Sequence, residues 1–437
     1  MNASIGDRLA MDAAENCDVL IIGGGPAGST AAALLAREGH DVRILEKEAH
    51  PRFHIGESLL PQNLKIFQRL GIQDRVHALG VLKPGAEFVS DECGQSSAFS
   101  FADAAGSGPR HAYQVKRADF DALLFARARE LGAHTMERIR VTDLGSMGPD
   151  GRLPVTAVDA DGRMHRFAAR FVLDATGRDT FLATRLRIKN ADKQNNTAAV
   201  YAHYRAVAPR GPGREGYISV YLVKDGWFWS IPLPDDVTSI GFVGDQAAFK
   251  GRTGGPEALL EARIAASPSL SKRLTGAERV TGVMSAGNYS YRATTNTGEG
   301  YMMIGDAYAF VDPVFSSGVL LAMNSATIGA DVAASWLKSP ARAKVLARRG
   351  QRELAGQMNR LGWLIYRIND PVMRHLFLDS GNKWRMREAI IALLAGNIGF
   401  HPSTFLPVLA FKAVFHLMSW QRRWFGVQPT PVATAAE

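Results

Sequence analysis

A glycine-rich turn lies between an apolar strand and an alanine-rich helix near the start of the chain, and few folds can accommodate it. The stretch "DVLIIGGGPAGSTAAALLAREGHDVRILEK", residues 18–47, opens with an apolar run and turns on glycines. It continues through an Ala- and Leu-rich helical segment and returns in a second strand that ends at Glu46. This order is one complete βαβ unit, in which a helix joins two parallel strands. An α/β sheet is therefore expected.

The glycines of this turn match the spacing G-x-G-x-x-G. Gly23 permits the tight turn, Gly25 lets the backbone approach a pyrophosphate, and Gly28 lets the helix pack closely on the strand. The helix N-terminus would face the anion. Glu46 ends the second strand, where its carboxylate can accept hydrogen bonds from a ribose hydroxyl. The pattern predicts NAD or FAD as the ligand, and a glycine-rich turn without a ligand is the alternative.

The rest of the chain divides into a β-rich middle and a helical end. Short β-type runs occur at "FVLDATG", "SVYLVKDGWFWSIPL" and "TSIGFVG", separated by turn residues, and they predict a mostly antiparallel sheet. From about Val319 onward the pattern becomes helical.

Length, cysteine content and charge limit the class of protein. A chain of 437 residues can bury one large core or about two to three smaller ones. Cys17 and Cys93 alone make neither a disulfide framework nor a metal site, which favours a reducing compartment.

Residues 1–16 lack the features of a secretory signal, so we expect a disordered start and a cytoplasmic location. The net charge of +9 attracts anionic partners, but no long basic run indicates nucleic acid.

Two later turns place acidic residues at strand ends. "FVLDATGRD" carries Asp174 and Gly177, and "GYMMIGDAY" carries Asp306. Asp306 can bind a polyol hydroxyl, and the backbone N–H groups around Ser317 and Gly318 can form a small anion or oxyanion site at a helix start. For the Asp174 turn alone, an Asp-capped loop without a ligand fits equally well. The three turns together indicate one ligand site.

Five motifs of this chain together resemble a known family. They are "GGGPAG", "GESLLP", "YQVKRADFD", "DATG" and "GDAYAFVDP". The combination is similar to the FAD-dependent monooxygenases of the p-hydroxybenzoate hydroxylase fold and, within them, most similar to the flavin-dependent halogenases. The resemblance covers residues 18–326 and makes FAD the expected cofactor. The region after it matches only in being helical.

The resemblance implies a fold of the α/β class with a doubly wound, Rossmann-type FAD-binding domain, an antiparallel substrate-side sheet and a helical C-terminal region. We expect the FAD-binding domain at residues 17–90, 110–185 and 290–335. The substrate-side sheet is expected at residues 91–109 and 186–289, and the helical region at residues 336–437.

The resemblance also implies a set of site residues. Gln114 and Arg117 would lie beside the cofactor, Asp306 would hold the ribitol, and Pro313 to Gly318 would line the isoalloxazine. The halide would lie at Ser317 and Gly318. The cofactor-binding set expected in this way is Gly23, Gly25, Ala27, Gly28, Glu46, Lys47, Ser58, Gln114, Arg117, Asp174, Gly177, Asp306, Pro313 and Gly318.

The stretch "WFWSIP" is a complete W-x-W-x-I-P, the pattern that distinguishes halogenases from ordinary flavin hydroxylases. By the resemblance, Trp227 and Trp229 fill the space beside the flavin and discourage direct oxygen transfer to the substrate. Without the resemblance, two indoles that share one strand face are better interpreted as core packing. With it, the flavin-facing role is preferred.

Lys83, in "GVLKPGAEF", has two interpretations. The local Lys-Pro-Gly sequence predicts a surface turn with a solvated lysine. In halogenases of the phenol and pyrrole type, a K-x-G-x-x-F segment after "GESLLP" supplies an essential lysine, and Lys83, Gly85 and Phe88 match it in order and rough spacing. Lys65 lies in a helical pattern, where it would point outward, and is the lesser candidate.

One departure from the family bears on the substrate. Tryptophan halogenases carry a glutamate just before their Ser-Thr-Gly chloride segment, whereas this chain has Phe315 before Ser316, Ser317 and Gly318. Free tryptophan is therefore disfavoured. A phenolic or pyrrolic substrate is favoured, including one tethered to a carrier protein, and an acidic carrier would suit the net charge of +9.

The resemblance implies that FAD, reduced by a separate flavin reductase, reacts with O2 and halide to give hypohalous acid. Lys83 would then hold this oxidant by a hydrogen bond, or carry the halogen as a haloamine, and deliver it to an electron-rich ring. The first alternative is an aromatic hydroxylase or reductase that uses NAD(P)H. The second is a flavin-binding partner protein that has lost catalysis.

The segment from Thr404 to Phe425 is apolar but is interrupted by Pro407, Lys412 and His416, which makes it a poor transmembrane helix. Its basic end and tryptophans suit a membrane interface, and a terminal helix docked on the protein body fits the same pattern. We expect docking on the body.

Overall fold

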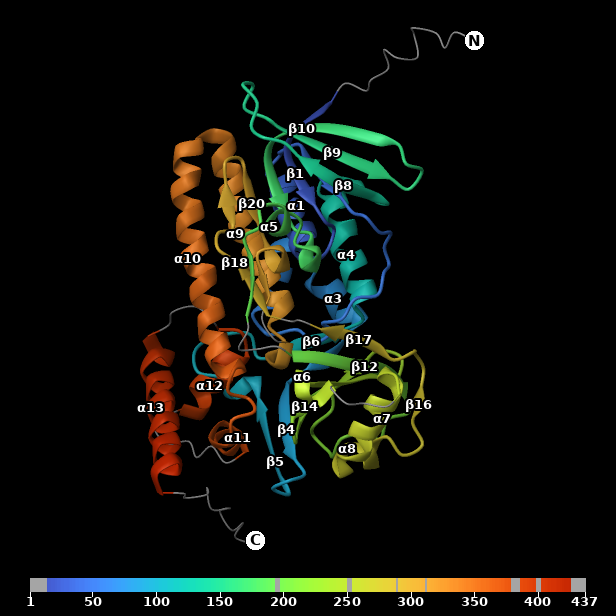
Figure 1. Ribbon diagram of the computed structural model, residues 1–437, viewed down its shortest axis with the longest axis vertical. Helices are drawn as coiled ribbons and strands as arrows, with labels where there is room; N and C mark the ends of the chain where they lie inside the picture. Colours follow the sequence, from blue (N-terminus) through green and yellow to red (C-terminus); the bar gives the residue numbers. More distant parts are fainter. Residues whose placement is uncertain are drawn as a thin grey trace.

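The computed structural model describes residues 14–192, 197–249, 254–287, 290–310, 313–378, 386–397 and 402–425. In Figure 1 these residues form an upper and a lower half, each built on a sheet, with the long helices α9 (Gly318–Lys338) and α10 (Pro340–Ile365) along one side.

The upper sheet is built on the predicted βαβ unit. β1 (Glu15–Ile22) pairs in parallel with β2 (Val42–Leu45) and with β10 (Met164–Asp174), so β1 lies in the centre. α1 (Pro26–Arg37) joins β1 to β2. Beyond these strands the parallel pairing continues with β20 (Tyr301–Met303) and β7 (His134–Met136), and β19 (Thr297–Gly298), β8 (Ile139–Leu144) and β9 (Leu153–Asp159) add antiparallel strands.

Helices pack beside one another against this sheet. α1 contacts α4 (Arg117–Glu130) on one side and α9 (Gly318–Lys338) on the other, and α10 (Pro340–Ile365) packs on α9. The small side chains of Ala31 and Ala32 are fully buried in α1. Because they are small, the helix can lie close to its neighbours.

Short elements connect the two halves. They are α2 (Asn63–Leu70), α3 (Gln73–Leu79), α5 (Phe181–Arg185), the pair β3 (Gly80–Lys83) and β6 (Ala112–Val115), and the small sheet β11 (Lys189–Ala191), β18 (Tyr291–Ala293) and β21 (Ala309–Phe310).

The lower sheet is mostly antiparallel, as predicted; only β4 and β13 pair in parallel among its described strands. Its strands, in spatial order, are β16 (Glu278–Arg279), β12 (Thr197–Arg205), β15 (Val237–Asp245), β14 (Gly226–Leu233), β13 (Ile218–Val223), β4 (Gly85–Ser90) and β5 (Gln95–Ser100), and β17 (Met284–Gly287) also pairs with β12.

The two faces of the lower sheet serve different cores. Phe228 and Phe242 face a smaller core that includes Leu260 and Leu270, which come from α7 (Pro256–Ala265) and α8 (Pro268–Arg273). The alternate side chains of β14, which include both tryptophans, belong to the main core instead. This is the period of two that a strand imposes. The short α6 (Gln246–Phe249) follows β15.

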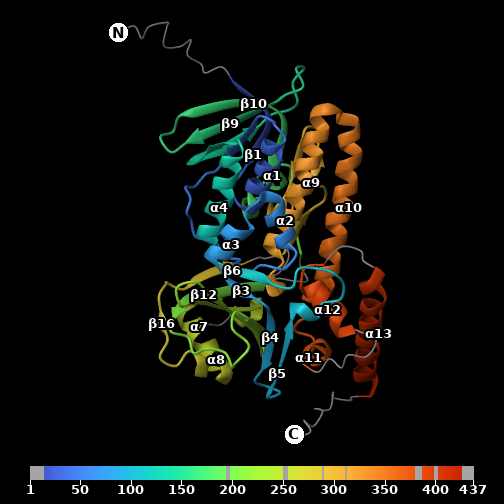
Figure 2. The same ribbon diagram turned by 180° about the vertical axis from the view of Figure 1, so that it is seen from behind.

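The C-terminal region is helical, as predicted. α11 (Pro371–Leu378), α12 (Met386–Leu394) and α13 (Pro402–Phe425) form a group at the lower end of α10. Figures 1 and 2 both show α13 as the outermost element on its side of the lower half, away from α7 and α8.

The predicted fold class is confirmed, but two expected boundaries are wrong. β4, which we expected in the FAD-binding segment, pairs with β13 in the lower sheet. The chain leaves the β3–β6 ladder at Pro84, because proline has no N–H to donate to it. At the start, residues 15 and 16 are not disordered but belong to β1, and residues 1–13 lie outside the described residues. The rest of the domain division stays a prediction.

Candidate active site

A cavity of about 630 Å³ lies between the two halves. On the upper side it is bordered by the turns that follow the carboxyl ends of β1, β2 and β10, and on the lower side by side chains of β13 and β14. Ligands of α/β proteins bind outside the carboxyl ends of parallel strands, so this is the position expected for a cofactor.

The glycine turn after β1 has the geometry that the spacing predicted. Gly23 has a φ of +103°, and a Cβ on Gly28 would lie 1.9 Å from the carbonyl oxygen of Gly23, so both positions need glycine. A Cβ on Gly25 would meet only Arg52 Nη2, at 3.7 Å. The space beside Gly25 is therefore open to the cavity, at the N-terminus of α1, where an anion is favoured.

Two further predicted residues border the same part of the cavity. Glu46 is buried, and its carboxylate accepts hydrogen bonds from the backbone N–H groups of Gly24 at 2.6 Å and Glu48 at 2.9 Å, one on each oxygen. Each oxygen keeps a lone pair for a ribose hydroxyl. Lys47 forms an ion pair with Asp179, which joins the turns after β2 and β10. Ala27 and Gly177 also line the cavity.

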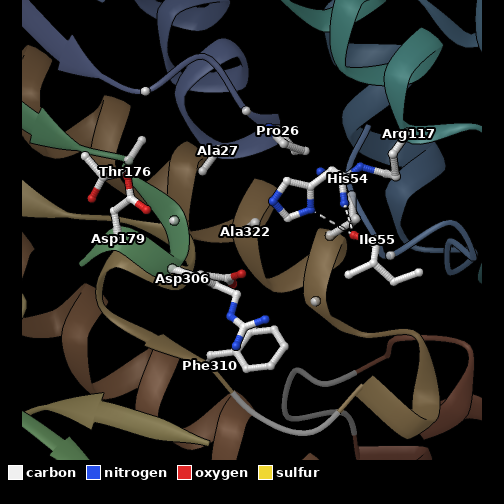
Figure 3. Close-up of a pocket in the computed structure, with 18 of the residues that line it drawn as sticks. Pro26, Ala27, His54, Ile55, Arg117, Thr176, Asp179, Asp306, Phe310 and Ala322 are labelled. Carbon is white, nitrogen blue, oxygen red and sulfur yellow. Dashed lines mark hydrogen bonds between the residues drawn. The ribbon is translucent and has the colours of Figure 1, made fainter. Parts of the chain in front are cut away.

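Figure 3 shows the groups that face each other across the cavity. On one side, Arg117 donates to the carbonyl oxygen of Ile55 at 2.7 Å, and its Nε and Nη2 bind Asp121 at 2.8 and 2.9 Å. His54 Nδ1 contacts the same Ile55 oxygen at 3.0 Å. Burial, together with the nearby Arg117, lowers the pKa of His54 to about 4, so its imidazole is neutral at pH 7.

Asp306 occupies the other side, in the turn that follows β20. Burial raises the pKa of its carboxyl to about 6, against the opposing effect of Arg117 and Arg178. Its backbone carbonyl accepts a hydrogen bond from Tyr291 at 2.8 Å, while the carboxylate points into the cavity. This carboxylate is placed to accept a hydrogen bond from a ligand hydroxyl.

Both predicted tryptophans line the cavity. Trp227 and Trp229 are nearly fully buried, and their ring centroids are 6.0 Å apart. Trp229 Nε1 donates to Ser239 Oγ at 3.0 Å, which fixes the indole orientation. A Cβ on Gly241 would lie 2.1 Å from the Trp229 ring, so glycine on the neighbouring strand makes room for it. The pair is therefore both part of the core and part of the cavity wall.

The start of α9 faces the cavity through Ser316 and Gly318. Ser317 is fully buried beside them, does not line the cavity, and its Oγ has no hydrogen-bond partner among the described residues. The helix N-terminus makes this a suitable region for an anion, but the predicted halide site stays a prediction. The side chain of Pro313 lies outside the described residues.

The interpretation of Lys83 as a solvated turn residue is wrong. Its side chain is 1% exposed, and its Nζ donates to the carbonyl oxygen of Leu59 at 2.9 Å and lies 5.4 Å from the centre of the Phe101 ring. Burial lowers the pKa of the amine to about 7. Lys83 does not line the cavity, but Ser58, the neighbour of Leu59, does. The amine therefore lies behind the cavity wall. Lys65 is exposed.

Neither Gln114 nor Asp174 lines the cavity, so neither has the position beside the cofactor that we expected. Gln114 is buried and turns toward the lower half, where its Nε2 donates to the carbonyl oxygen of Gly216. The carboxylate of Asp174 accepts hydrogen bonds from Thr176 N, Thr176 Oγ1 and Leu182 N at 2.7 to 3.0 Å. These donors hold the turn after β10 together, so Asp174 is the Asp-capped loop that we considered as the alternative.

A buried acid–histidine pair at the cavity was not predicted. Glu57 lines the cavity, is 1% exposed, and binds His203 Nε2 through Oε1 at 2.8 Å. The other oxygen of Glu57 and the hydroxyl of Ser58 have no hydrogen-bond partner among the described residues. "GESLLP" contained the signal for Glu57, but His203 is 146 residues away on β12, and no local pattern indicates it.

These observations fit FAD. The cavity has room for a large ligand, and the N-termini of two helices border it, where anionic groups are favoured. Buried oxygen atoms of Glu57 and Ser58 have no hydrogen-bond partner among the described residues, so a ligand could supply one. Acidic acceptors for hydroxyl groups stand at Glu46 and Asp306.

Comparison with known families agrees with this fit. Residues 16–353 match the family model of the FAD binding domain, and FAD as the cofactor is thereby confirmed. The flavin-dependent halogenase armH3 of Armillaria mellea is 33% identical over 345 residues, which are 74% of this chain and 68% of that protein. The 1H-pyrrole-2-carbonyl-[peptidyl-carrier protein] chlorinase of Pseudomonas fluorescens is 30% identical over 334 residues, 71% of this chain and 74% of that protein. The chain spans 60% to 74% of the length of the curated relatives that it matches.

Two solved structures resemble this protein over more of the chain. The myxobacterial chondrochloren halogenase CndH superposes with a TM-score of 0.76 at 31% identity, covering 95% of this chain and 98% of its own. A flavoprotein/dehydrogenase from Cytophaga hutchinsonii superposes with a TM-score of 0.85 at 28% identity, covering 93% of this chain and 100% of its own. Motifs, site and relatives therefore agree, and the chain belongs to the flavin-dependent halogenase family.

Proposed function

We propose that this chain is an FAD-dependent halogenase that uses reduced FAD, O2 and halide to halogenate an electron-rich aromatic ring. The observation that carries the proposal is the burial of the Lys83 amine together with its lowered pKa. Its amine is fully buried directly behind the wall of the cofactor cavity, and its pKa of about 7 leaves about half of it neutral at neutral pH. A neutral amine is a nucleophile, whereas an ordinary surface lysine is protonated.

Different residues of the cavity would bind different parts of FAD. The turn from Gly23 to Gly25 would hold the pyrophosphate, Glu46 a ribose hydroxyl, and Asp306 a ribitol hydroxyl. The two tryptophans of β14 would limit the space on the lower side of the flavin ring. When bound and reduced, FAD supplies the electrons that activate O2.

Lys83 would receive the halogen from hypohalous acid. The nitrogen lone pair attacks the halogen, the N–halogen bond forms as the O–halogen bond breaks, and water leaves after a proton passes from nitrogen to hydroxide. The carbonyl of Leu59 accepts an N–H of the amine and so orients its lone pair. A hydrogen bond from the amine to intact hypohalous acid is the alternative way of holding the oxidant.

The surroundings of Lys83 support an apolar aromatic substrate. Phe101 lies beside the amine, and Phe377 of α11 stacks on Phe88 at 4.8 Å and meets Phe315 at 5.9 Å. This aromatic group includes the position where tryptophan halogenases carry glutamate. Apolar, aromatic surroundings of this kind suit a phenolic or pyrrolic ring, and the name of the chlorinase relative supports delivery on a carrier protein. A separate flavin reductase as the partner, and a cytoplasmic location, also stay proposals.

A second candidate follows from the flavoprotein/dehydrogenase that superposes at a TM-score of 0.85. The experiment that separates the two functions begins with NADPH alone, added to the purified protein with FAD. Fast oxidation of NADPH would favour a dehydrogenase or hydroxylase. If oxidation waits for an added flavin reductase, and mass spectrometry then finds brominated phenol or pyrrole acceptors in the presence of bromide, the halogenase function is supported. No turnover in either step would indicate an inactive flavin-binding protein.

The affinity for FAD is expected to depend on pH through Asp306. The pKa of this carboxyl is about 6 in the free protein. As the pH falls below that value the carboxylate gains a proton and loses the charge that accepts the ribitol hydrogen bond, so FAD binding should weaken by up to about tenfold per pH unit. Fluorescence titration of the apoprotein with FAD between about pH 8 and pH 5 measures this.

The matched variant is Asp306→Asn, which keeps the shape of the side chain but cannot titrate. We expect it to bind FAD about 10- to 100-fold more weakly at pH 8, because a hydrogen bond to a charged group is lost, and to show a flat profile down to pH 5. A wild-type profile as flat as that of the variant would contradict the assignment of Asp306.

A further inference from the structure

The C-terminal helix α13 has an apolar face that packs on the protein body and a second apolar face whose side chains are exposed. On the inner face, Phe411 and Phe415 are buried. Trp363 of α10 meets their rings edge-on at 6.3 and 5.4 Å, and the amine of Lys412 lies 4.9 Å from the centre of the same indole. The expected docking of this segment on the protein body is thus confirmed.

The outer face of α13 is apolar from Leu406 to Trp424. Leu406 is 70% exposed and Trp424 is 71% exposed, with further exposed residues between them. We call this set the exposed stripe, and its members are Leu406, Leu409, Ala413, Leu417, Trp420 and Trp424. Steps of three and four residues keep them on one side of a helix, over about 27 Å.

The stripe is not an ordinary scatter of surface hydrophobics. Of the twelve large hydrophobic side chains that are exposed among the described residues, six belong to α13. The other six are spread over the rest of the molecule, which is the common case for soluble proteins. Among the helices and strands that the structure describes, Figures 1 and 2 show α13 as the outermost on its side of the lower half.

The charges beside the stripe are of one sign. The helix sequence from Pro402 to Phe425 contains no Asp or Glu, and it ends in Arg422 and Arg423. Arg423 is exposed, and Arg422 is half-buried. The whole chain carries a net charge of +9. These cations would face a negatively charged partner surface.

The physical type of partner follows from length, composition and charge together. Of the helices that the structure describes, none is long and apolar enough to cross a membrane. A helix that combines an apolar stripe, tryptophans and a basic end is suited to lie flat in a lipid interface, where the indoles sit at the headgroup level and the arginines meet anionic lipid.

We propose that the exposed stripe of α13 binds the surface of an anionic lipid bilayer and holds the protein on it. A second copy of the chain is a poorer occupant, because it would bring Arg422 and Arg423 against a helix that has no acidic residue to pair with them. The inner face, with Phe411 and Phe415, keeps α13 attached to α10 while the stripe is in the lipid.

The test is cosedimentation of the full-length, FAD-loaded protein with vesicles. Vesicles of phosphatidylcholine with about 30% phosphatidylglycerol should carry the protein into the pellet, and pure phosphatidylcholine should carry several-fold less. Trp420→Ser combined with Trp424→Ser should reduce binding to the anionic vesicles at least about tenfold. Raising the salt to about 0.5 M should weaken wild-type binding in part, because it screens only the arginines.

A matched control removes exposed apolar side chains elsewhere. Val345→Ser combined with Met164→Ser changes two residues that are 68% and 51% exposed, and it should bind vesicles like the wild type. Because all four substituted side chains are exposed, FAD content and melting temperature should stay unchanged and show that each variant is folded.

Several results would overturn the proposal. Wild type that stays in the supernatant with anionic vesicles, or that pellets no better than the tryptophan variant, excludes a lipid role. A dimer in analytical ultracentrifugation that the tryptophan variant breaks, without vesicle binding, assigns the stripe to a second copy. Retention of a purified acidic acyl carrier protein by the wild type but not by the variant, again without vesicle binding, assigns it to a protein partner.

Discussion

Replacing Lys83 by Met is expected to lower the rate of halogenation at least about 100-fold, equivalent to about 2.7 kcal/mol or more in the activation barrier. FAD content, flavin reduction and oxygen consumption should stay close to wild type, because none of those steps uses the amine. The oxidant would still be made but no longer held, so hydrogen peroxide or free hypohalous acid should leak into solution. Product is measured by mass spectrometry and the leaked oxidant by a colorimetric assay.

Met is chosen because Lys83 is fully buried. Both Lys83→Ala and Lys83→Met leave the carbonyl of Leu59 without its donor, but only Ala also leaves a void in the core, because Met fills most of the volume. We expect the Ala variant to lose the same activity and some stability, and comparison of the two separates chemistry from packing. Lys65→Ala, at an exposed lysine nearby in the sequence, is the matched control and should halogenate normally.

The pH profile offers an independent check on the same residue. Since the pKa of Lys83 is about 7, the neutral fraction of the amine rises as the pH increases through 7, and the halogenation rate should rise with it.

If the Met variant retains more than about a tenth of the wild-type rate, a deficit below about 1.4 kcal/mol, Lys83 is not the delivery residue.

Gly25→Val should give a folded protein that purifies without FAD, with an affinity at least about 100-fold below that of wild type. A Cβ at this position meets only Arg52 Nη2 within 4 Å, so we expect the backbone to keep its fold. The space that the side chain fills is the part of the cavity assigned to the pyrophosphate. The ratio of flavin absorbance to protein absorbance measures the loss.

Two other glycines make this result specific. Gly211→Val, at a site where an added Cβ meets nothing within 4 Å, should bind FAD normally. Gly28→Val should fail differently, as an unfolded or aggregated protein, because its Cβ would lie 1.9 Å from a backbone oxygen. Yellow Gly25→Val protein with wild-type FAD stoichiometry would refute the placement of the cofactor.

The residues predicted best from the sequence are those whose surroundings are made by their own neighbours. Gly23, Gly25, Gly28 and Glu46 belong to one βαβ unit, so their spacing along the chain already specifies their spacing in space. The tryptophan pair is a similar case, because alternation along β14 puts both indoles on one face. The sequence of the strand does not indicate whether that face packs into the main core or into the smaller one.

Local sequence patterns mislead where the surroundings of a residue come from distant segments. The Lys-Pro-Gly sequence around Lys83 is that of a solvated turn, and only the packing of Leu59 and Phe101 against it buries the amine and lowers its pKa. Gln114 has a motif beside the cofactor, but the carbonyl of Gly216, 102 residues later, turns it away from the cavity.

The glycine turn, the order of the elements and the family could be predicted from the sequence, because each of these depends on short-range spacing. Three other features come from the packing of distant segments: the Glu57–His203 pair, the burial of Lys83, and the division of α13 into a docked face and an exposed stripe. The physical reason is that burial and electrostatic environment are set by whichever segments pack together. A helix that is apolar on both sides carries no local sign of which side its own protein will cover.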